Sequence, residues 1–101
     1  MERQEKLKEF IARDPADYFS RHALAMEYIK IGNEQAARDL LEKILIDNPL
    51  YIGSYYHLGK LYERIGEPAL AQDVYEKGID VARSLNDRHA MGELNTALNL
   101  L

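Results

Sequence analysis

Hydrophobic residues recur along the chain at spacings of three and four, the period of an amphipathic helix. Two such stripes have the same form and are each followed directly by glycine: Leu24, Tyr28, Ile31 and Gly32, and then Leu58, Tyr62, Ile65 and Gly66. A helix end favours a residue that tolerates a left-handed backbone, and glycine does so best. The pattern therefore predicts two helices that end at these glycines and bury their stripes in a core.

The two stripes are 34 residues apart, and the same offset relates further pairs. The pairs are Leu24 and Leu58, Tyr28 and Tyr62, Ile31 and Ile65, Gly32 and Gly66, Ala37 and Ala71, and Asp14-Pro15 and Asn48-Pro49. A fixed period of this length indicates a repeat architecture. We assign the repeats to residues 18–51 and 52–85.

A second amphipathic helix follows each glycine. Asn33 can cap the first of these helices, and Pro68 fits the first turn of the second. Their apolar or small residues are Ala37, Leu40, Leu41, Ile44 and Leu45, and then Ala71, Val74, Tyr75, Gly78 and Ile79. Asn48-Pro49 ends the earlier helix, because a residue before proline is disfavoured from helical geometry. Small residues at matched positions (Ala25 and Gly59, Ala37 and Ala71) allow two antiparallel helices to approach closely.

The two ends of the chain continue the helical pattern. Leu7, Phe10 and Ile11 align with the stripe at Leu41, Ile44 and Leu45, which predicts a second-type helix of a preceding half-repeat in residues 1–17. Ala90, Leu94, Ala97, Leu98 and Leu101 share one helical face and predict a capping helix in residues 86–101. We expect one all-α domain, residues 1–101, in which about six antiparallel helices stack as hairpins of a solenoid. The half-repeat suggests that the chain was cut from a longer array.

The repeated residues closely resemble the tetratricopeptide repeat, whose pattern is an aromatic residue, Leu-Gly, Tyr, Ala, a large apolar residue and a late proline. The second repeat supplies Tyr55, Leu58, Gly59, Tyr62, Ala71 and Tyr75, with Arg83 at the proline position. The first supplies Leu24, Ala25, Tyr28, Ala37, Leu41 and Pro49, with Arg21 at the aromatic position. The resemblance implies a protein–protein interaction module whose inner groove holds a peptide or a helix of a partner protein.

In this family the first helices of successive repeats line the groove. The corresponding positions are Phe19, His22, Met26, Ile29, Lys30, Tyr56, Lys60, Glu63 and Arg64. Phe19, Met26 and Ile29 lie off the core stripe, and surplus apolar residues at helical spacing mark a contact surface. We expect these three and Tyr56 to anchor a partner, while the charged residues of the second repeat select its charge. Alternatively, the terminal helices or a second copy of the chain cover the apolar residues.

Two further uses of the fold are considered. Chaperone-binding members hold a C-terminal carboxylate with Lys, Asn and Arg, and those positions are His22, Met26, His57, Asp87 and Met91 here. None matches, so we expect no carboxylate of this kind as ligand. Self-association as an oligomerisation scaffold is the alternative function, because Leu98, Leu100 and Leu101 and the open half-repeat offer apolar ends.

Composition limits the remaining possibilities. The 101 residues contain no cysteine, which excludes a disulfide scaffold and a cysteine nucleophile. A net charge of −4 argues against nucleic acid as partner, because helical RNA-binding repeats need basic side chains beside their stacking residues. The chain has neither a signal peptide nor an apolar run near the length of about 18 residues that spans a bilayer. We expect a cytoplasmic protein without membrane contact.

The sequence offers little for catalysis. His22 and His57 lie on first-type helices and, with Glu63, could in principle bind a metal ion. No histidine lies three or four residues from another, however, so no local spacing prepares such a site. Phosphate-loop, nucleophile-elbow and dinucleotide-binding motifs are also absent from the sequence. We expect no enzymatic activity, no cofactor and no metal.

Overall fold

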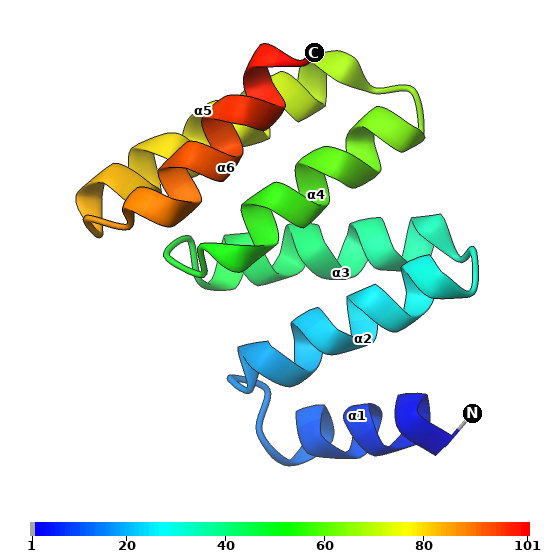
Figure 1. Ribbon diagram of the computed structural model, residues 1–101. Helices are drawn as coiled ribbons and strands as arrows, with labels where there is room; N and C mark the ends of the chain where they lie inside the picture. Colours follow the sequence, from blue (N-terminus) through cyan, green and yellow to red (C-terminus); the bar gives the residue numbers. More distant parts are fainter. Residues whose placement is uncertain (1) are drawn as a thin grey trace. The chain divides into compact units, whose positions relative to one another are not determined.

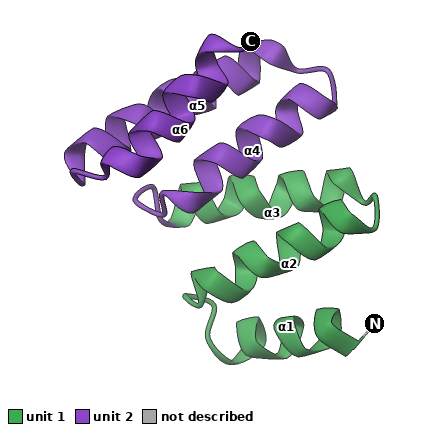
Figure 2. Ribbon diagram, in the orientation of Figure 1, with its two compact units in different colours: residues 1–47 green, residues 48–101 purple. Residues whose placement is uncertain are grey.

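The computed structural model describes residues 2–101, and this range contains six α-helices and no strand (Figure 1). The helices are α1 (Glu2–Arg13), α2 (Tyr18–Lys30), α3 (Glu34–Asp47), α4 (Gly53–Arg64), α5 (Pro68–Ser84) and α6 (Arg88–Asn99). The all-α prediction with about six helices is confirmed. The chain divides into two compact units, one ending at Asp47 and the next beginning at Asn48 (Figure 2).

The first unit contains α1, α2 and α3, and α2 packs against both of the others. Its core contains Leu7, Ala23 and Leu24, with Ile11, Tyr28 and Leu40 packed against them. The alignment of Phe10 with Ile44 does not extend to burial, because Ile44 is fully buried whereas the Phe10 side chain is 44% exposed. Within its unit α1 packs mainly on α2, so only the side that carries Leu7 is covered.

The helix ends follow the predicted glycines. Gly32 and Gly66 have φ angles of 82° and 80°, in the left-handed region. The next amide in each turn donates to a carbonyl five residues back, from Asn33 to Tyr28 and from Glu67 to Tyr62, both at 2.8 Å. These bonds satisfy carbonyls that the helix end would leave unpaired. As predicted, the side chain of Asn33 caps α3, because its Oδ1 accepts from the amide of Ala36 at 3.3 Å.

The core stripe of α2 is shorter than the sequence predicts. Ile31 was expected in the core with Leu24 and Tyr28, but it is 52% exposed. The helix ends at Lys30, and Ile31 is its C-cap. The stripe of α2 therefore ends at Tyr28.

The second unit contains α4, α5 and α6, in which α5 packs against both α4 and α6. Gly59 allows the close approach that the sequence predicts, because a β-carbon there would lie 2.1 Å from Cε1 of Tyr75. The Tyr75 ring is fully buried, and its hydroxyl donates to Oε2 of Glu63 at 2.5 Å. Burial and this hydrogen bond to a carboxylate raise the pKa of the Tyr75 hydroxyl. One turn further along α5, a β-carbon at Gly78 would lie within 3.0 Å of Tyr55 on α4 and of Leu94 on α6.

Arg21 takes the part that an aromatic residue takes in the second repeat. The hydroxyl of Tyr55 donates to the carbonyl oxygen of Pro49 at 2.6 Å, and Nη1 of Arg21 donates to that of Pro15 at 3.1 Å. Both donors lie six residues after the proline they hold. Nη2 of Arg21 also donates to Oδ2 of Asp47 at 3.0 Å, which pairs the charge of a side chain that is only 8% exposed. Two different side chains thus hold equivalent proline turns in the two repeats.

Candidate functional site

The residues predicted to bind a partner lie on two helices. Five of them, Phe19, His22, Met26, Ile29 and Lys30, share one side of α2 in the first unit. Phe19 is 74% exposed, Lys30 is exposed, and the other three are half-buried. The remaining four, Tyr56, Lys60, Glu63 and Arg64, lie on α4 in the second unit.

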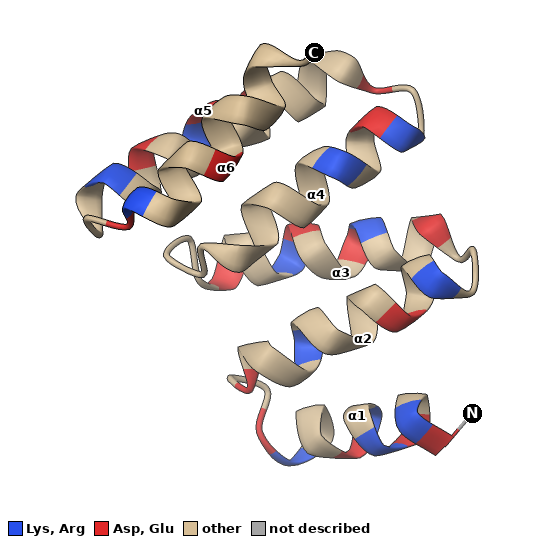
Figure 3. Ribbon diagram, viewed as in Figure 1, with Lys and Arg blue, Asp and Glu red and all other residues tan. Residues whose placement is uncertain are grey.

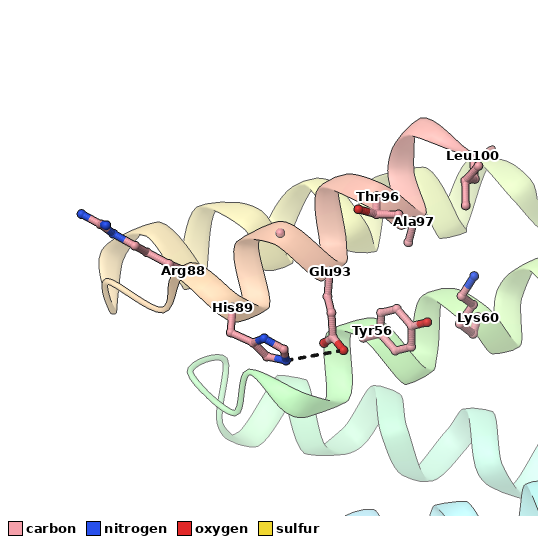
Figure 4. Close-up of a pocket in the computed structure, with 9 residues that line it drawn as sticks. Tyr56, Lys60, Arg88, His89, Glu93, Thr96, Ala97 and Leu100 are labelled. Carbon is pink, nitrogen blue, oxygen red and sulfur yellow. Dashed lines mark ion pairs between the residues drawn. The ribbon is translucent and has the colours of Figure 1, made fainter.

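A groove of about 540 Å³ lies between α4 and α6 and takes in two of these residues, Tyr56 and Lys60 (Figure 4). From α6 it is lined by Arg88, His89, Gly92, Glu93, Thr96, Ala97 and Leu100, the last just beyond the helix end. The two helices run in the same direction, so the groove has two distinct ends (Figure 1). It is the candidate functional site of this unit.

Tyr56 and Lys60 form the α4 side of the groove. They are one helical turn apart, and Nζ of Lys60 lies 5.6 Å from the centroid of the Tyr56 ring, within cation–π range. The ring of His57 meets that of Tyr56 edge to face, with 5.5 Å between centroids. Burial lowers the pKa of His57, and the nearby carboxylate of Glu93 opposes this shift in part. Neutral imidazole is therefore favoured beside the groove.

The α6 side of the groove carries a negatively charged side chain, opposite in sign to the lysine on α4, and one position that has no side chain. Oε2 of Glu93 lies 3.8 Å from Nε2 of His89, one turn earlier on the helix. Gly92 has no heavy atom within 4 Å of the place where a β-carbon would stand. Arg88 and Glu93 are the only charged residues of α6 besides its histidine, and most of the helix is therefore coloured as uncharged in Figure 3. The start of α6 is fixed by Asp87, whose Oδ1 accepts from the amide of Ala90 at 3.0 Å.

The other two α4 residues predicted to bind a partner lie outside this groove. The carboxylate of Glu63 accepts the Tyr75 hydroxyl, so it is held toward α5, and its distance to Nζ of Lys60 is 3.8 Å. Arg64 is exposed at the last position of the helix. Neither residue lines the α4–α6 groove.

Sequence reasoning missed the whole contribution of α6. It treated residues 86–101 as a cap, compared Asp87 and Met91 only with carboxylate-binding positions, and assigned the leucines at the C-terminal end to packing or self-association. A polar stripe was nevertheless present, because His89, Glu93 and Thr96 recur at spacings of four and three, the period of one helix face, and Leu100 ends that face with an apolar side chain. The 34-residue alignment could not reveal it, because the register shifts after Leu85.

Residues 2–101 lack two other kinds of feature, a metal-binding cluster and a membrane-spanning helix. No three His, Asp or Glu side chains in this range lie together in a way that could hold a metal ion. None of its helices combines the length and the apolar character needed to cross a membrane.

Comparison with known proteins gives one consistent family. The family model described as tetratricopeptide repeat matches residues 52–85, the bounds assigned above to the second repeat. A curated TPR repeat-containing protein of Pseudomonas aeruginosa is 26% identical over 97 residues, which is 96% of this chain and 92% of that protein.

Solved structures agree. The solution structure of a tetratricopeptide repeat domain protein from Salinibacter ruber is 45% identical, with a TM-score of 0.81 over 84% of this chain and 86% of that one. A solution structure from Bordetella parapertussis is 27% identical, with a TM-score of 0.80 over 95% of this chain and 84% of that one. A match at this identity along most of both molecules, with the repeat pattern and the helix hairpins already described, shows that the chain belongs to the tetratricopeptide repeat family.

Proposed function

We propose that this chain binds a peptide or a helix of a partner protein along the α4–α6 groove, without catalysis. The proposal agrees with the general role of the tetratricopeptide fold as a non-enzymatic module for protein–protein interaction. The observation that carries the proposal is the open groove of about 540 Å³, which combines an aromatic ring and a lysine on α4 with a polar stripe on α6.

The lining suits an extended or helical ligand. Tyr56, Ala97 and Leu100 supply apolar surface, and Leu100 is 75% exposed. A half-buried tyrosine offers a large rigid contact at small entropic cost, which is the property of interface hot spots. Charged residues at the margins of the groove then discriminate between ligands. For the first unit, Phe19, Met26 and Ile29 on α2 are proposed as apolar contacts to a partner protein.

Selection from a random peptide library displayed on phage, followed by amide chemical-shift mapping, tests this function. We expect selected peptides to bind with shifts concentrated at Tyr56, Lys60 and Gly92, and Tyr56→Ala to abolish binding while helical circular dichroism is retained. Lys77→Ala is the control, because Lys77 pairs with Asp73 on α5 and does not line the groove. Unchanged affinity of Tyr56→Ala, or failure to select any peptide, would contradict the proposal.

Self-association is a second candidate, supported by the exposure of Leu100, Leu101 and Phe10 near the two ends of the chain. Apolar side chains exposed at an array end can stack on another copy. Light scattering should then show a molar mass that rises with concentration, and Leu101→Lys should reduce it. A monomeric mass at millimolar concentration would rule this candidate out.

A further inference from the structure

Resting on the proposed function, we propose that the α4–α6 groove selects peptides in which an apolar residue lies between an acidic and a basic residue. The acidic residue would face Lys60, the apolar residue would lie over Gly92 beside Tyr56, and the basic residue would face Glu93.

The opposite charges of the groove are separated by its aromatic ring. Lys60 and Glu93 line the same groove from different helices, and Figure 4 shows the Tyr56 ring between the Glu93 carboxylate and the Lys60 ammonium group. A ligand that covers the ring therefore meets a positive side chain on one side and a negative one on the other. A uniformly charged peptide would gain at one of these and be repelled at the other.

The partners within the chain leave both charges able to bind a ligand. Lys60 lies 3.8 Å from Glu63, beyond hydrogen-bond distance, and that carboxylate already accepts the Tyr75 hydroxyl. Glu93 likewise lies 3.8 Å from His89, whose own side chain is almost fully exposed. His57 faces the same carboxylate, but its burial favours neutral imidazole. Near the Glu93 end of the groove, the other charged side chains are those of Asp87 and Arg88 at the start of α6.

Gly92 provides the place for the apolar residue. Glycine is disfavoured inside a helix, and a close contact within the chain is the usual reason to find it there. Gly59 and Gly78 have such contacts, whereas Gly92 is exposed and has no neighbour within 4 Å. Its missing side chain opens the groove beside Tyr56, Ala97 and Leu100, where a ligand side chain can approach the backbone of α6.

The test uses three defined peptide sets with a central leucine, flanked by one acidic and one basic residue, by two acidic residues, or by two basic residues, at several spacings. Fluorescence polarisation should show the mixed set binding about three- to fivefold more tightly than either uniform set, as expected for one exposed ion pair gained. Lys60→Glu should shift the preference to two basic residues, and Glu93→Lys to two acidic ones. Lys77→Glu changes the charge of the chain equally outside the groove and should leave the preference unchanged.

The outcomes separate this inference from the proposed function. If peptides bind and Tyr56→Ala abolishes binding, but neither charge reversal changes the preference, the inference is overturned and the function stands. If no peptide binds, both fail. If Leu100→Lys lowers a concentration-dependent mass and the peptides compete poorly, a second copy of the chain occupies the groove and the inference is overturned. Circular dichroism of each variant confirms that the fold is retained.

Discussion

The contact between Gly59 on α4 and Tyr75 on α5 should make these two positions exchangeable only as a pair. A β-carbon at Gly59 would lie 2.1 Å from Cε1 and 2.5 Å from Cζ of the Tyr75 ring. The ring is fully buried and its hydroxyl is bonded to Glu63, so it cannot move aside without losing that bond. The first repeat has Ala25 and Leu41 at the equivalent positions, both fully buried. A larger residue on one helix is thus matched by a smaller one on the other.

The size of the effect follows from this geometry. Gly59→Ala should destabilise by about 1–2 kcal/mol. An approach of 2.1 Å to a buried ring belongs to the severe end of overpacking, about 2–3 kcal/mol, and the helix propensity of alanine returns about 1 kcal/mol. Tyr75→Leu should destabilise by about 2–3 kcal/mol through the space left over Gly59 and the lost hydrogen bond. In the double variant the new methyl group fills part of that space. We expect the double variant to lose about 1–2 kcal/mol, clearly less than the sum of the two single losses.

Urea unfolding followed by circular dichroism measures these free energies by linear extrapolation. Gly92→Ala is the matched control, because it makes the same change in a helix where no atom lies within 4 Å, and it should stabilise by about 1 kcal/mol. Additive losses in the double variant, or a Gly59→Ala protein as stable as the wild type, would refute the packing argument.

Three further predictions concern stability. Arg21→Ala should unfold at lower urea concentration. The double variant Arg21→Tyr with Asp47→Val introduces the residues found at the equivalent positions of the second repeat, and it should recover most of the lost stability. No recovery would show that the two turns are held differently. Because burial lowers the pKa of His57 in the fold, stability is complete above its unfolded pKa of about 6.5 and falls as pH drops through that value toward the folded pKa. His57→Phe should therefore flatten urea midpoints between about pH 7 and pH 5, and equal slopes would contradict this. Asp87→Ala removes the cap of α6 and should cost about 1 kcal/mol in urea unfolding, whereas Asp87→Asn should cost much less.

Local features of the sequence were enough to predict the helix boundaries. Gly32 and Gly66 adopt the left-handed geometry for which glycine is suited, α3 ends directly before Asn48-Pro49, and α5 begins at Pro68. Each of these residues acts through backbone constraints that depend only on its neighbours in the chain. The positions of the turns could therefore be predicted without knowledge of the packing.

Exposure depends on distant residues and was harder to predict. Phe10 matches a buried residue of the next repeat, but α1 has too few neighbours to cover it. The α6 side of the groove was missed because α5 has 17 residues where α3 has 14, and residues 85–87 form a shorter link than residues 48–52. These changes shift α6 out of the 34-residue register. Asn86, with a φ of 56°, occupies the left-handed position of that turn, where sequence analysis expected no special residue.

The two repeats build the same hairpin from different residues, and this difference helps to locate the functional surface. Arg21 replaces Tyr55 at a proline turn, and Ala25 with Leu41 replaces Gly59 with Tyr75 between the helices. Each of these departures from the family pattern has a compensating contact within the chain.

Gly92 has no such compensating contact. Glycine weakens a helix, and no heavy atom lies within 4 Å of the place where a β-carbon of residue 92 would stand. Lys60 and Glu93 likewise face a groove, with their ion-pair partners at 3.8 Å. Where the identity of a residue is not explained by the requirements of folding, we expect it to be explained by ligand binding. If the proposed function is correct, we expect a ligand of the second unit to gain most of its binding energy around Tyr56 and Gly92. Gly92→Leu should therefore weaken peptide binding without lowering the urea midpoint, and a loss of both together would place Gly92 among the packing residues instead.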